Sequence, residues 1–193
     1  MTSRDQSAIL TALVRGHFSS LGEPDVDSAD LVLTLLDEAY EKRTWHGPNL
    51  KQSLRGVTAK QAAWRPGRGR HNIWEVAVHA AYWKYTARRR IEGGKRGSFV
   101  LKGSNFFTRP AAGANTEKAW IADKELLERE HRALLQAVVA LRGTPRWEKL
   151  LPQLWGIAFH DVYHAGQIRL LRRLSGAALQ ERREPHARRI RVH

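Results

Sequence analysis

The residues most suited to metal binding or catalysis are two histidines, His160 and His164, which lie four positions apart in the segment 154–174. Ile157 and Ile168 continue the same pattern of three- and four-residue steps, which predicts one buried face of a helix. Residues four apart share a side of a helix, so both imidazoles can bind one metal ion. His79, on the apolar face of another helical segment, is the candidate third ligand.

Three histidines with an open fourth position are typical of a catalytic metal site rather than a closed structural one. The chain has no cysteine, which excludes disulfides and thiolate ligands. Nitrogen donors suit Zn, Ni, Co, Fe or Cu, and zinc lowers the pKa of a bound water to about 7. The alternative is three ordinary core histidines, whose ring nitrogens would need separate partners at about 1–3 kcal/mol for each one left unpaired. The spacing alone leaves both alternatives open.

Other polar residues are weaker candidates. Glu75 is expected to complete a capping box at its helix start, with orientation of His79 as the alternative. Asp161 is either a partner of the metal ligands or a polar residue at the edge of the helix face. Gln167 is expected to line the pocket. His46 is either an acid or base at the pocket mouth or an ordinary exposed loop residue.

The elements that must position these residues are four amphipathic helices in an all-α bundle, because the strand signal is weak throughout. Ser28 is the expected cap of a helix over 29–44, and Asn72 of a helix over 73–91. Thr116 is expected to cap the third long helix, and Gly176 to end the fourth, which contains 154–174. The expected organisation is an N-terminal helical arm, a four-helix bundle, and a basic C-terminal tail: 1–27, 28–175 and 176–193.

The net charge is +14, carried by 33 Lys and Arg against 19 Asp and Glu. The basic residues are spread over a loop, a helix end, a second loop and the tail: Arg65, Arg68, Arg70; Lys84, Arg88, Arg89, Arg90; Lys95, Arg96, Lys102; Arg182, Arg183, Arg188, Arg189, Arg191. No aromatic residues are regularly interleaved with them, so a basic solvated surface with weak nonspecific nucleic-acid binding is favoured over a dedicated nucleic-acid site. No signal peptide or membrane-spanning run is evident, and we expect a cytoplasmic protein.

Two segments, His71–His79 and His160–Ile168, resemble the DinB/YfiT-like family of bacterial metalloproteins. The stretch Trp45–Leu50 and the start Thr116–Trp120 are similar to one DinB branch, and the resemblance covers about 28–175. It implies a four-helix bundle, frequent homodimers, and a divalent transition metal such as Zn, Ni or Fe held by three histidines. The matching ligands are His79, His160 and His164. Relatives include thiol-dependent S-transferases and isomerases, and hydrolases.

The leading interpretation is therefore a metal-dependent enzyme that activates a thiol or water against a small electrophilic substrate. The substrate would pass the Gly-, Ser- and Pro-rich loop over 95–114 into a pocket lined by Trp83, Phe106 and Gln167. The thiol would be a low-molecular-weight one. The alternative is a basic nucleic-acid-associated or small-molecule-binding bundle in which the metal is structural.

Overall fold

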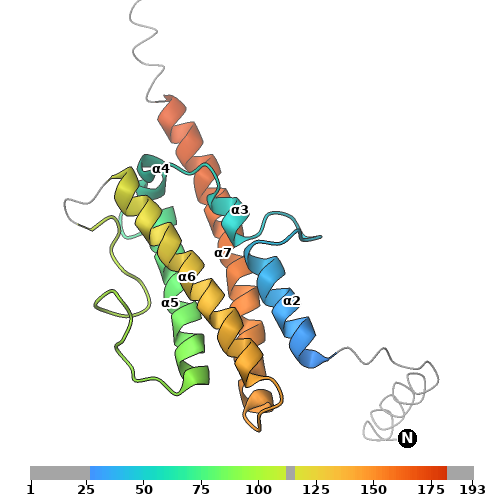
Figure 1. Cartoon of the computed structure of the whole chain (residues 1–193). Helices are drawn as coiled ribbons and strands as arrows, with labels where there is room; N and C mark the ends of the chain where they lie inside the picture. Colours follow the sequence, from blue (N-terminus) through green and yellow to red (C-terminus); the bar gives the residue numbers. More distant parts are fainter. Residues whose placement is uncertain (1–26, 112–115, 182–193) are drawn as a thin grey trace, which may run out of the picture.

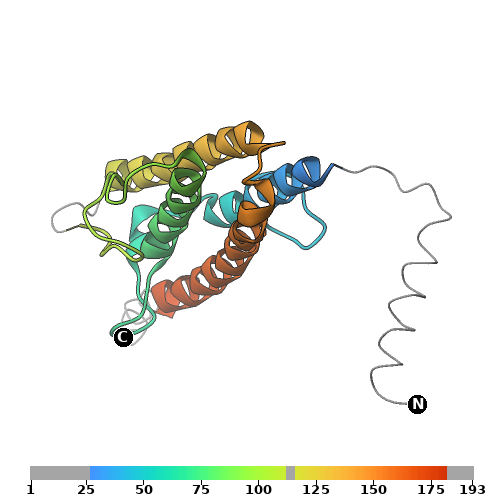
Figure 2. The same ribbon diagram turned by 90° about the horizontal axis from the view of Figure 1, so that it is seen from below.

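The protein is an all-helical bundle, seen from two sides in Figures 1 and 2. The computed structural model describes residues 27–111 and 116–181, and no strand occurs in these two ranges. Four long helices and two short ones follow in chain order: α2 (Ser28–Tyr40), α3 (Leu50–Leu54), α4 (Ala59–Ala63), α5 (Ile73–Glu92), α6 (Glu117–Leu141) and α7 (Trp147–Glu181). The predicted all-α class is confirmed.

The four long helices, α2, α5, α6 and α7, form the bundle, and α3 and α4 cross one end of it (Figure 1). Helix α5 packs against both α6 and α7, and α2 packs against α7 and α6. Side-by-side packing of α5 and α7 is what allows side chains from the second and fourth long helices to meet. Within the described ranges, none of the helices has the length and apolar character needed to cross a bilayer.

The helix starts depend on side-chain caps, and most of the predicted caps are present. Asn72 accepts a hydrogen bond from Glu75 N at 2.8 Å, and Thr116 accepts one from Ala119 N at 3.2 Å. The predicted cap of the first helix was wrong, because Asp27 rather than Ser28 accepts from Ala29 N. Ser28 instead accepts a hydrogen bond from the indole of Trp147 at 3.0 Å, which ties the start of α2 to the start of α7. Helix α2 ends at Tyr40, four residues before the expected end.

Helix α7 is longer than the sequence predicts. It begins at Trp147, and Pro152 lies in its second turn. The proline removes one backbone hydrogen bond there without ending the helix. Gly176 does not end the helix either, because a glycine costs only about 1 kcal/mol in a helix interior and the neighbouring turns continue to Glu181. The expected tail boundary at 176 therefore falls inside α7. Residues 1–26 of the expected arm over 1–27, and residues 182–193 of the tail, lie outside the described residues.

The hydrophobic core has two clusters, both of which include residues of α5, and one of them also includes aromatic residues of the long loop. Phe99 and Phe107 are buried against Tyr82 and Tyr85, which pins the loop after α5 to the bundle. Lys84, which the sequence places on a basic surface, is instead completely buried.

Candidate metal centre

Three histidines meet between α5 and α7. His79 comes from α5, and His160 and His164 come from α7. The Nε2 atom of His160 lies 3.0 Å from Nε2 of His79 and 3.0 Å from Nε2 of His164. One ligand atom from each of the three lies within 4.8 Å of the others. His79 and His164 are buried and His160 is half-buried, so the cluster sits at the inner end of an opening.

The outer nitrogens of two of these rings are held by fixed acceptors. Nδ1–H of His79 donates to the backbone carbonyl of Asn105 at 3.0 Å. Nδ1–H of His164 donates to Oε1 of Gln167 at 2.6 Å, and the amide of Gln167 donates in turn to the hydroxyl of Tyr163 at 2.9 Å. An acceptor at Nδ1 fixes the proton there, so both Nε2 atoms present lone pairs to the centre.

The protonation of His160 determines whether the three inward nitrogens can all form hydrogen bonds with one another. Its Nδ1 is buried and has no hydrogen-bond partner among the described residues. If the His160 proton is on Nε2, it can be donated to the lone pair of His79 or to that of His164, but not to both. If the proton is on Nδ1, neither of these lone pairs receives a hydrogen bond from His160. At least one inward nitrogen therefore has no hydrogen-bond partner among the described protein groups. A cation at the centre would satisfy all three lone pairs at once.

The spacing and protonation of the three rings fit a metal ion. Tetrahedral coordination at zinc–nitrogen distances of about 2.0–2.1 Å puts ligand nitrogens about 3.3 Å apart, and the two Nε2 separations of 3.0 Å are a few tenths shorter. Burial lowers the pKa of His79 below its ordinary value. Burial lowers the pKa of His160 to about 3 and that of His164 to about 4, with the neighbouring imidazoles acting in the same direction. All three are neutral at pH 7, as metal ligands must be.

A pocket of about 480 Å³ opens onto the cluster. Phe106 and Gln167 line it, as predicted. The ring of Phe106 lies between those of His79 and His71, with centroid distances of 3.9 and 3.7 Å, and so covers one face of a ligand. The lining on the α7 side is completed by aromatic and apolar residues, Tyr163, Leu170 and Leu171. The other side has Val76 of α5 and two residues of the preceding loop, Arg70 and His71.

Two of the weaker sequence candidates lie elsewhere. Trp83 meets the rings of His79 and His160 edge-on, at centroid distances of 6.3 and 6.2 Å, but lines a different pocket. His46 is exposed between α2 and α3 and is not among the residues that line the 480 Å³ pocket. Trp83 therefore contacts the cluster without lining the 480 Å³ pocket, and His46 does not line that pocket either.

Glu75 neither completes the capping box nor forms a hydrogen bond with His79, so both expectations for it were wrong. Its carboxylate accepts hydrogen bonds from Arg65 at 2.5 and 2.8 Å and contacts Nδ1 of His71 at 3.0 Å. Burial alone would raise the pKa of Glu75, but these hydrogen bonds outweigh burial and lower it to about 2. Glu75 therefore fixes the loop that carries His71 at the edge of the pocket.

Two positions matter in ways that the sequence reasoning did not identify. Asn105 has a positive φ of 64°, and its side chain accepts a hydrogen bond from Trp83 at 3.1 Å. Asparagine tolerates this left-handed backbone better than most residues, which is the one signal the sequence offered. Asp161 is fully buried and forms an ion pair with Lys84 of α5. It is therefore neither a hydrogen-bond partner of the three histidines nor a polar residue at the edge of the helix face, and both expectations for it were wrong.

The comparison with known families agrees with this geometry. A family model described as the DinB superfamily matches residues 43–168, well over half of the chain, including all three histidines. Searches of curated proteins and of solved structures give no match. Members of this superfamily bind metal ions, and the cluster of His79, His160 and His164 fits a metalloprotein. The chain belongs to the DinB superfamily.

Proposed function

We propose that this protein is a metal-dependent enzyme in which His79, His160 and His164 hold one divalent transition-metal ion. The substrate is a small electrophile that occupies the 480 Å³ pocket. The reaction is attack by a thiol or a water molecule, as in an S-transferase or a hydrolase. The observation that carries the proposal is the arrangement of three inward-facing imidazole nitrogens that have too few protons to satisfy one another.

The ion would act as a Lewis acid that lowers the pKa of a thiol or water. The protein's own residues orient the ligands and shape the pocket. Asn105 and Gln167 hold the outer nitrogens of two ligands, which fixes the direction of their lone pairs. Val76, Phe106 and Leu171 make the walls apolar, which excludes water around a bound substrate. Arg70 adds a positive charge at the edge, which suits a substrate or thiol that carries a carboxylate.

A catalytic role is favoured over a structural role for the metal by the number of ligands. Structural zinc sites are closed by four protein ligands, whereas catalytic sites keep one position open. The cluster contains three candidate ligands in the described ranges, and the pocket leads to it. A metal that only braced the bundle would not require this opening.

The first test is elemental analysis of tag-free protein purified without added metal. We expect about one transition-metal ion per chain and its loss in His160→Ala. The matched control is His46→Ala, which removes an exposed imidazole and should keep the metal. Stoichiometric metal in His160→Ala would show that the ligand assignment is wrong. Thiol-transfer and hydrolysis assays on the metal-loaded protein then separate the two reaction types, and their failure over a broad substrate panel would favour a structural metal.

We also propose that the chain forms a homodimer through the outer face of α7. Large apolar side chains follow one another there, within about 100° of the helix circumference: Trp155, Phe159, Tyr163, Leu170 and Leu174. Phe159 is 66% exposed and Leu170 is 58% exposed, and a two-fold interface uses the same patch on both subunits. Tyr163 and Leu170 also line the pocket, so a second copy would border the site. Sedimentation should give a dimer that Phe159→Glu converts to monomer, whereas a monomeric wild type would refute the proposal.

A further inference from the structure

A second pocket, of about 790 Å³, lies between the C-terminal half of α5 and the loop over 96–104. Four of its lining residues are cationic and none is acidic: Arg89, Arg90, Arg96 and Lys102. The rest are aromatic, apolar, glycine or hydroxyl-bearing, including Tyr82, Tyr85, Phe99, Thr86 and Ser104. The wall therefore combines an apolar surface with a formal charge of +4.

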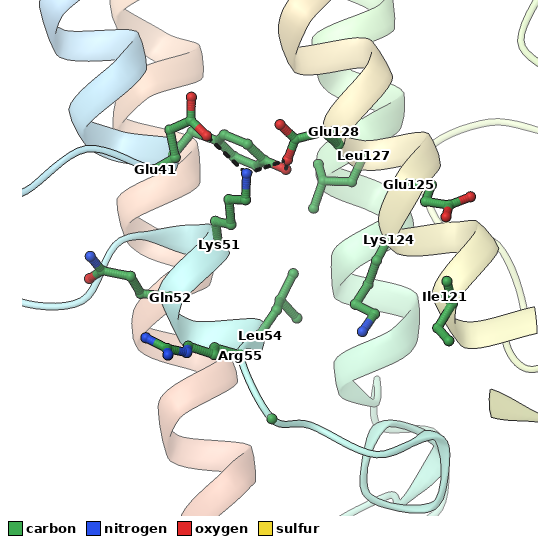
Figure 3. A pocket seen from close by; sticks show the side chains of 12 residues that line it. Glu41, Lys51, Gln52, Leu54, Arg55, Ile121, Lys124, Glu125, Leu127 and Glu128 are labelled. Atoms are coloured by element: carbon green, nitrogen blue, oxygen red, sulfur yellow. Dashed lines mark hydrogen bonds and ion pairs between the residues drawn. The ribbon is translucent and has the colours of Figure 1, made fainter. Parts of the chain in front are cut away.

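These four cations are not neutralised by carboxylates in the part of the chain that the structure describes. The only hydrogen bond of the Arg89 guanidinium there goes to the carbonyl of Gly94, at 3.1 Å. The pocket in Figure 3 provides a contrast, because the ammonium of Lys51 in it lies 2.9 Å from Glu41 and 2.8 Å from Glu128. That pocket carries equal numbers of basic and acidic side chains, so it offers an anion no net attraction.

The basic residues at the end of α5 have a simpler possible role, which is to offset the negative end of the helix dipole. The dipole amounts to about half an elementary charge, so one cation is enough. The last carbonyls are also already bound, since Gly94 N–H donates to Arg89 O and Arg146 donates to the carbonyls of Arg90 and Ile91. Arg90, Arg96 and Lys102 are therefore surplus to the needs of the helix.

We propose that this pocket binds a small phosphorylated molecule with an apolar or aromatic body, of about the size of a nucleotide. Phosphate groups carry several charges, and guanidinium groups bind them through paired hydrogen bonds. The volume lies within the range of about 300–1,000 Å³ that holds such ligands. A concave site whose cations come from both α5 and the loop that line it suits a small molecule better than an extended nucleic-acid strand.

The inference does not depend on the proposed metal enzyme. Trp83 lies between the two sites, because it lines the cationic pocket and meets His79 and His160 edge-on. Binding of the anion should therefore survive in His160→Ala. Failure of one proposal would leave the other standing.

Calorimetric titration of the full chain with ATP near physiological salt is the direct test. We expect saturable binding of ATP, with adenosine at least about 10-fold weaker because it has no phosphate. Combining Arg90→Gln, Arg96→Gln and Lys102→Gln should weaken ATP binding at least about 100-fold. The control removes the same charge from three exposed cations that do not line this pocket, in the combined variant Arg129→Gln, Lys149→Gln and Arg173→Gln.

Three outcomes would overturn the proposal. Equal loss in the pocket variant and the control would show that ATP responds only to net charge. Adenosine binding as tightly as ATP would show that the cations bind no phosphate. Tight binding of a single-stranded oligonucleotide without binding of ATP would assign the surface to a nucleic-acid backbone. All these variants change exposed side chains, and equal thermal midpoints would confirm that they fold.

Discussion

The buried ion pair between Lys84 of α5 and Asp161 of α7 should contribute strongly to the stability of the protein, next to the proposed metal ligand His160. Both side chains are completely inaccessible, and Asp161 directly follows His160 in the chain. The ammonium of Lys84 also lies 3.3 Å from Nδ1 of His131 and 5.0 Å from the ring centre of Tyr40. Replacing the lysine in Lys84→Met keeps the apolar stem and removes the charge. The Asp161 carboxylate would then be buried with no cation beside it.

The expected cost follows from burial. Removing one partner of a buried ion pair destabilises a protein by about 3–5 kcal/mol, a large part of a total stability of about 5–15 kcal/mol. For a chain of this size, at about 2–4 °C per kcal/mol, such a loss lowers the thermal midpoint by about 6–20 °C. Replacing both partners, in Lys84→Met with Asp161→Leu, removes both buried charges. The double variant should therefore lie within about 1–2 kcal/mol of the wild type.

The assay is urea unfolding followed by the fluorescence of the chain's tryptophans, with the wild type, both single variants and the double variant measured together. Chelator-treated protein is used so that metal binding does not contribute. The control is Lys149→Met, which removes an exposed cation and should change stability by less than about 0.5 kcal/mol. A cost below 1 kcal/mol for either single variant, or additive costs in the double variant, would refute the view that these charges compensate each other.

Two further predictions concern the residues around the cluster. In a metal titration, Asn105→Ala should lower metal affinity about 10- to 100-fold, because alanine disfavours φ 64° and the carbonyl that holds His79 would shift. Asn105→Gly should lose much less affinity in the same titration, because glycine accepts this backbone conformation. Glu75→Gln should cost about 2 kcal/mol of unfolding free energy at pH 7, discounted because Arg65 is partly exposed. The pKa of Glu75 is lowered to about 2, so its contribution is present above pH 4.5 and disappears as the pH falls towards 2; unfolding curves that stay apart at pH 2 would contradict this.

The sequence predicts best what depends on local periodicity. Apolar residues at three- and four-residue steps gave the long helices, and the same steps placed His79, His160 and His164 on inward faces. Side-chain caps such as Asn72 are local as well, since the hydrogen bond reaches only three residues. Convergence of the histidines additionally required that the second and fourth long helices be neighbours, which the resemblance to the DinB/YfiT-like family implied and periodicity alone did not.

Two of the predictions that failed depend on contacts outside the local motif from which they were made. Glu75 has the sequence of a capping box, but Arg65 offers a charged partner that a backbone N–H cannot match. Lys84 belongs to a run of basic residues, yet Asp161 from a helix 77 residues away allows it to be buried. Gly176 looks like a helix end, but nothing in its own neighbourhood imposes a left-handed turn. The residue that decides the environment of Lys84 lies far along the chain, and the partner of Glu75 lies ten residues before it, outside the four residues of a capping box. Gly176 shows that a glycine by itself does not end a helix.

Contacts within the folded chain also determine how much of the net charge of +14 is available to bind a ligand. A total charge describes long-range attraction, whereas binding depends on which cations remain free to contact a ligand. Lys84 is buried against Asp161, Lys51 is bound by two glutamates, and Arg65 holds Glu75. None of these can serve nucleic acid without losing an internal contact. The basic residues around the 790 Å³ pocket have no such partners among the described residues, so the attraction to anions should concentrate in a concavity rather than extend over the surface.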